Sequence, residues 1–105
     1  KGIGNPKTIR EFEIELALQK QKDRLAIANQ HLERAMMLEG KRQGPAAIRE
    51  YQQSIIMLPQ HKVFVQMLDC CRKFRLDNHA EQLSEWFERV QEADPEEEIP
   101  PLEID

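Results

Sequence analysis

The feature that most constrains this chain is a long segment that contains neither glycine nor proline. Both residues interrupt α-helices, and neither occurs in residues 9–39. Apolar residues recur along the segment at spacings of three, four and seven residues, which is the period of one helix face. Only residues 19–24 are polar throughout. We therefore predict one long helix, exposed or kinked at the polar stretch, in preference to two helices with a break there.

Capping residues, glycine and proline mark the ends of this helix and of three shorter ones. Thr8 and Glu11 have the spacing of a capping box, so the first helix is expected to begin at Ile9, after an irregular lead-in over residues 1–7. Residues 40–45 contain two glycines and end it. The other predicted helices cover residues 45–58, residues 61–75 and a segment that follows Asn78 as N-cap and ends at Pro95.

This pattern predicts an all-α fold of antiparallel helical hairpins with a long N-terminal helix. A chain of 105 residues has room for one domain with a modest core, which we place in residues 8–94. Residues 95–105 are acidic, lack any apolar period and contain Pro100 and Pro101, so they are predicted to be a disordered tail. A solvated tail or a linker is the preferred interpretation of this segment, and a short linear docking motif is the alternative.

Charge and cysteine usage narrow the class of protein. The net charge is −4, but six acids lie from Asp94 onward, and the rest of the chain is close to neutral. Nucleic-acid binding is therefore not expected.

Cys70 and Cys71 are adjacent, which suits neither an internal disulfide nor the spacing of zinc ligands. We predict reduced core thiols and an intracellular protein, with the cytoplasm preferred and the nucleus as the alternative. No membrane insertion is expected, since a span needs roughly 20 apolar residues.

The second half of the chain repeats a pattern found in the first half. Six positions recur at the same offsets 36 residues later, and together they follow the order of small, aromatic and proline positions in a helical hairpin, with Leu83 and Val90 in place of small residues. The pairs are Ala35 and Cys71, Leu38 and Phe74, Ala47 and Leu83, Tyr51 and Phe87, Ser54 and Val90, and Pro59 and Pro95. A hairpin of this kind must stack on a neighbour to bury its apolar face.

On these residues the chain resembles the tetratricopeptide-repeat family, with degenerate repeats over residues 28–61 and 64–97. The resemblance implies a groove, lined by the first helix of each repeat, that holds a peptide or helix of a partner protein. The implied lining residues are Asn29, Leu32, Met36, Val65, Leu68, Arg72 and Arg75, with Glu39 beside them. Leu32, Met36 and Asp69 stand at the positions of the carboxylate clamp that some members use to bind chaperones, so the clamp is absent. An apolar partner segment with some acidic character is expected.

Other candidate sites have simpler interpretations. No arrangement of nucleophile, base and acid, and no phosphate-binding loop, can be recognised, so we predict no catalysis, no cofactor and no metal. The basic cluster around Arg72 and Arg75 is interpreted as a solvated face in preference to a receptor for acidic residues. The four methionines are assigned to the core in preference to a docking surface. For Trp86, burial by the N-terminal helix and a role as an interface anchor are weighted equally.

The leading hypothesis is a scaffold or adaptor module that binds a partner protein. One alternative is an oligomerisation unit, in which the first helix pairs with a second copy through Leu25, Leu32 and Glu39 at seven-residue spacing. Another is a three-helix MIT-type domain that binds helical motifs, which residues 46–58 resemble. An ordered fourth helix across residues 80–90 would remove that last alternative.

Overall fold

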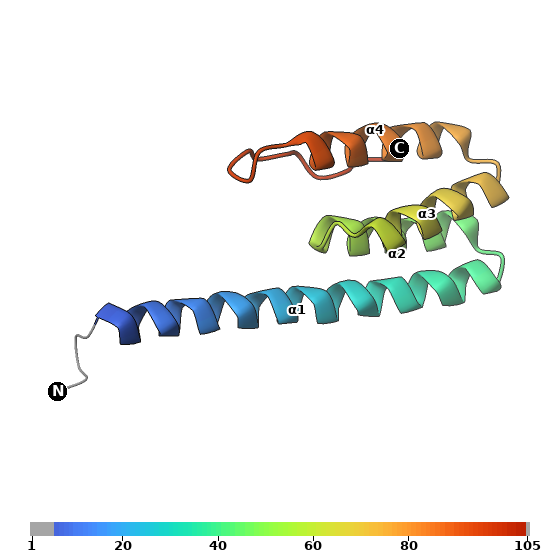
Figure 1. Ribbon diagram of the computed structural model, residues 1–105. Coiled ribbons are helices and arrows are strands. Elements are labelled where there is room, and N and C mark those ends of the chain that lie inside the picture. The colour runs from blue at the N-terminus through green and yellow to red at the C-terminus, as the bar shows by residue number, and fades with distance from the viewer. Residues whose placement is uncertain (1–5, 105) are drawn as a thin grey trace.

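The structure is a computed structural model that describes the backbone of residues 6–104 and the side chains of residues 12–104. In this part of the chain there are four α-helices and no strand, which confirms the all-α fold with a long N-terminal helix (Figure 1). The helices are α1 (Pro6–Gly40), α2 (Gly44–Met57), α3 (His61–Lys73) and α4 (Asp77–Glu92). The predicted helix positions are within three residues of these bounds.

The capping predictions are wrong in detail. α1 begins at Pro6, so Thr8 lies inside the helix instead of at its N-cap. α4 begins at Asp77, which places Asn78 inside that helix, and its N-cap residue Leu76 makes no side-chain capping bond. Most of the predicted irregular lead-in lies outside the described residues. Pro45 is confirmed in the first turn of α2, where its missing N–H costs no helical hydrogen bond.

Helix α1 is continuous over 35 residues, including the polar stretch at residues 19–24. Its C-terminal half packs against α2, whereas its N-terminal half projects beyond the other helices (Figure 1). The chain therefore measures 63 Å along its longest axis and only 28 and 19 Å across. One long helix is favoured over a break because no glycine or proline interrupts the backbone bonds.

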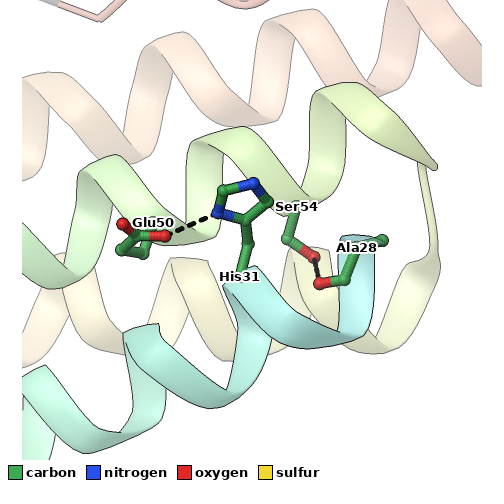
Figure 2. Close-up of polar contacts among 4 residues, drawn as sticks. All are labelled: Ala28, His31, Glu50 and Ser54. Carbon is green, nitrogen blue, oxygen red and sulfur yellow. Dashed lines mark hydrogen bonds and ion pairs between the residues drawn. The ribbon is translucent and has the colours of Figure 1, made fainter. Parts of the chain in front are cut away.

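The contact between α1 and α2 is built from small residues. Ala28, Ala35, Ala47 and Ser54 are all fully buried, and their size lets the two antiparallel backbones approach closely. The Ser54 hydroxyl donates a hydrogen bond of 2.8 Å to the backbone carbonyl of Ala28, across the two helices (Figure 2). This bond satisfies the buried Ser54 hydroxyl, which would otherwise destabilise the core.

The remaining helices stack in chain order, α2 on α3 and α3 on α4. Their contacts bury one continuous core that runs through the stack. Its largest fully buried side chains are Tyr51, Ile55, Met67, Leu83, Val63, Cys70, Cys71 and Ser54. Because α4 is ordered and packs on α3, the structure does not fit a three-helix MIT-type domain.

The loop between α1 and α2 and the loop between α3 and α4 have the same backbone geometry. Each has three residues, and each places an arginine in the left-handed region, with φ of 60° at Arg42 and 59° at Arg75. In each loop the third residue donates its backbone N–H to a carbonyl five residues earlier, Gln43 to Leu38 and Leu76 to Cys71. The loops are 33 residues apart, so the period of the backbone differs by three residues from the sequence period of 36. Three residues are close to one helical turn, and both alignments therefore put buried residues on the same helix face.

The first turn of α2 packs against the end of α3 through Gly44. A Cβ atom added at Gly44 would lie 2.7 Å from Cγ of Phe74, closer than packed carbon atoms come in a folded core. Gly44 is buried at the start of α2, and Phe74 caps the end of α3. Glycine is thus required here for the close approach of the phenyl ring.

The acidic tail is not the disordered segment that the sequence suggested. It has no helix, but it runs back along α4 and α2 (Figure 1), and Leu102 is 3% exposed in the core. Gln52 of α2 donates a hydrogen bond to the carbonyl of Leu102, and the Trp86 indole N–H donates one of 2.8 Å to the carbonyl of Pro100. Composition alone suggested disorder because it does not reveal the apolar site that α2 and α4 form for one leucine.

We expect Gly44→Ala to lower the free energy of unfolding by about 1–3 kcal/mol, because the added methyl group overpacks the contact with Phe74. Urea denaturation followed by circular dichroism measures the change. Gly40→Ala is the matched control: nothing lies within 4 Å of its added Cβ, and it should be neutral or stabilise the helix. Partial rescue by Phe74→Leu would locate the effect in this contact, and equal stability of the two alanine variants would contradict it.

We expect Leu102→Ala to destabilise the protein by about 2 kcal/mol, the lower end for a buried leucine, because an irregular segment can relax into the cavity. The neighbouring change Glu103→Ala, at an exposed position, should have little effect. The same denaturation experiment compares the two. An unchanged midpoint for Leu102→Ala would mean that the tail is not part of the folded core.

Candidate functional site

An open hollow of about 340 Å³ lies between α1 and α3, with α2 behind it. One wall comes from the end of α1, and the other comes from the middle and the end of α3. The lining residues are Met36, Glu39 and Gly40 of α1, Tyr51 of α2, and Gln66, Asp69 and Lys73 of α3. We call this set the α1/α3 hollow.

Glu39 ties together the three helices that form the α1/α3 hollow. The Tyr51 hydroxyl donates a hydrogen bond of 2.7 Å to Oε1 of Glu39, and Nζ of Lys73 lies 3.6 Å from Oε2. Burial, and then the hydrogen bond to the Glu39 carboxylate, raise the pKa of Tyr51 well above its ordinary value, so it remains a neutral donor. Tyr51 is therefore a fixed floor of the hollow.

The rest of the lining offers an apolar surface and unused polar capacity. Met36 is 53% exposed, and a thioether of this kind adapts to varied apolar side chains. Oε1 of Gln66 is shielded from solvent and accepts no hydrogen bond. The hollow contains two carboxylates, Glu39 and Asp69, but one ammonium group, Lys73, and that group already lies beside Glu39. An apolar side chain next to a basic group would complement this arrangement.

The structure brings two of the predicted groove residues, Met36 and Glu39, into the hollow. Leu32 is 8% exposed and belongs to the core, so its placement on a groove surface is wrong. Asn29 is half-buried and lies outside the α1/α3 hollow. The expected residues of α3 (Val65, Leu68, Arg72) and Arg75 beyond its end do not line it either.

The error has a definite cause in the repeat period. Asp69 and Lys73, which line the hollow, follow Met36 and Gly40 by 33 residues, the spacing of the loops. The sequence period of 36 instead selected Val65, Leu68 and Arg72, each one position before a lining residue, and one position rotates a side chain by about 100° around the helix. A period of 33, taken from the loops, would have placed Asp69 opposite Met36, which the sequence period did not do.

A second polar contact lies at the edge of the α1–α2 interface. Nδ1 of His31 is 2.7 Å from Oε2 of Glu50, and both side chains are about one-quarter exposed, at 24% and 26% (Figure 2). Figure 2 shows the pair beside the buried bond between Ser54 and Ala28, on the same two helices. The pair flanks the helix contact and lies outside the α1/α3 hollow, so we assign it to the packing of α1 on α2.

Cys70 and Cys71 are confirmed as core residues, with no exposed surface. Burial raises the pKa of Cys70 to about 12 and that of Cys71 to about 11, from an ordinary value of 9.0. Thiols of this kind are poor nucleophiles near neutral pH because the reactive thiolate is hardly populated. In the described side chains, no group of three or more His, Cys, Asp or Glu residues is placed to hold a metal ion.

Trp86 lies against the tail, so its expected burial by the N-terminal helix is wrong, and its role as an interface anchor stays a prediction. Its indole N–H donates to the carbonyl of Pro100 in the tail, and Trp86 lines two open hollows of about 360 and 290 Å³. The partner that partly covers Trp86 is therefore the C-terminal segment of the same chain and not the N-terminal helix. The methionines divide between the two interpretations: Met67 is fully buried, whereas Met36 and Met37 are more than half exposed.

Comparisons of this chain with models of protein families, with curated proteins and with solved structures find no match. No helix within the described residues combines the length and the apolar composition needed to cross a membrane.

We expect both thiols to resist a thiol-reactive reagent such as DTNB in the native protein at pH 8, because the folded state holds their pKa values far above that pH. In denaturing urea both should react at the rate of a free cysteine. The measurement is the absorbance of released thionitrobenzoate with time. Rapid labelling of either cysteine without denaturant would contradict the buried position.

Proposed function

We propose that this chain is an intracellular protein–protein interaction module that holds a segment of a partner protein in the α1/α3 hollow. The observation that carries the proposal is the exposed Met36 in one hollow with the Asp69 carboxylate, which has no ion pair among the described side chains, on a floor that Tyr51 and Glu39 make rigid. The proposal needs no catalytic group, and the buried, reduced cysteines suit an intracellular location.

The place of the hollow supports the proposal. The resemblance to tetratricopeptide repeats implies binding by the first helix of each hairpin, and α1 and α3 are those helices. The chemistry differs from the expectation of an acidic partner, because Arg72 and Arg75 lie outside the hollow. We infer that the partner segment carries an apolar side chain for Met36 next to a lysine or arginine for Asp69.

The hydrogen bond from Tyr51 to Glu39 and the ion pair between Lys73 and Glu39 also support a preformed site. Glu39 already has partners on α2 and α3, so a ligand need not order these side chains. A site that is ordered before binding loses less conformational entropy when the ligand arrives. The size of the hollow, about 340 Å³, suits one or two side chains of a peptide and is small for a whole helix.

Selection from a random peptide library displayed on phage tests this proposal with the wild-type chain as bait. Selected peptides should share an apolar residue next to a basic one, and synthetic versions should bind Met36→Glu at least about tenfold more weakly, a difference of roughly 1.4 kcal/mol. Asp69→Lys should remove the preference for the basic residue. Fluorescence anisotropy measures each dissociation constant.

Met37→Glu is the matched control. Met37 neighbours Met36 on the same helix and is 61% exposed, but it does not line the α1/α3 hollow. Its affinity for the peptides should equal that of the wild type. Equal loss of affinity in both methionine variants, or selected peptides that share no basic residue, would refute the proposed site.

A further inference from the structure

The N-terminal half of α1 presents apolar side chains that nothing in the described part of the chain covers. This half projects beyond α2, α3 and α4 (Figure 1). Large side chains on it are strongly exposed, for example Ile14 at 55%, Leu18 at 53% and Leu25 at 38%. Apolar surface of this extent along one helix usually marks a contact with another protein chain.

These exposed residues continue the stripe on which α2 is packed. The stripe alternates steps of four and three residues along α1, which is the pattern of helices that pack side by side. Its members are Ile14, Leu18, Gln21, Leu25, Ala28, Leu32 and Ala35. The last three are buried beneath α2, and the first four extend the same face past the end of α2. The uncovered part, residues 14–25, is a seat for a further helix.

The seam expected from the sequence, Leu25, Leu32 and Glu39, is not available as a whole. Leu32 is in the core, and Glu39 is bonded to Tyr51. Any helix pairing through α1 must therefore use the opposite end, around Leu18. This end is separate from the α1/α3 hollow, which begins at Met36.

The charges along this half of α1 indicate which helix would fit. Residues 11–18 contain three acids and no base, whereas residues 19–24 contain three bases and one acid. Glu15 and Lys22 have no opposite charge three or four positions away, the spacings at which side chains on one helix meet. These charges are thus left without partners within α1.

We propose that the occupant of this seat is the same segment of a second copy, packed antiparallel to the first. The antiparallel direction lays the acidic half of each helix beside the basic half of the other, and a parallel direction would bring like charges together. A two-fold axis midway between Leu18 and Gln21 would set Ile14 opposite Leu25 of the second copy, and Glu15 near Lys22 of the second copy. The same patch then serves both copies, as two-fold symmetry requires.

Sedimentation velocity over a range of concentrations tests the proposal with the full chain. Wild type should shift from the mass of one chain to that of two as concentration rises, because a short seam with one glutamine gives a reversible dimer. Leu18→Glu should remain a single chain throughout. Leu16→Glu, at an exposed position on another face of α1, is the matched control and should dimerise like the wild type.

Charge reversal tests the direction of the pairing. Glu15→Lys alone should weaken the dimer, and Glu15→Lys with Lys22→Glu should restore it, because both partners of an antiparallel pair are then exchanged. A wild-type chain that stays monomeric at every concentration overturns the proposal. This is the result expected if the stripe binds a different protein. Dimerisation of Leu18→Glu, equal loss in Leu16→Glu, or failure of the double reversal also overturns it.

Discussion

The close contact of α1 with α2 is the constraint on which the rest of the structure depends. Small residues at the crossing allow the backbones to approach, and the hydrogen bond from Ser54 to the Ala28 carbonyl satisfies the buried hydroxyl. Larger side chains would separate the helices and move Tyr51 away from Glu39. The floor of the α1/α3 hollow is thus fixed by the packing of residues that do not line it.

A second close contact, between a small and a large residue, occurs where the two hairpins meet. Gly44 lies beneath the ring of Phe74, and each loop has an arginine in the left-handed region. The hairpins are consequently joined both through the core and at the contact of Gly44 with Phe74. This double connection holds α1 and α3 at the separation that leaves the hollow open between them.

The C-terminal tail, which has no helix or strand, completes the hydrophobic core of this small protein. Leu102 enters the core between α2 and α4, and Trp86 and Gln52 bond to the backbone beside it. The N-terminal half of α1 shows the contrasting case, an apolar stripe that the chain itself does not cover. The tail thus covers apolar surface of α2 and α4, whereas the stripe on α1 is the surface that we propose pairs with a second copy.

The sequence by itself determined the four helices, the unbroken length of α1 and the core thiols, because these follow from local periodicity and from the placement of glycine and proline. It did not determine the groove. The residues that line the hollow on α3 depend on where each helix begins relative to its loop, and the period of 36 read from Tyr51 and Phe87 differs from the 33 of the backbone. Only the tertiary structure decided this, as well as the burial of Leu102. A shift of three residues conserves the buried face of a helix, and hence its pattern, but changes which neighbours the exposed residues meet.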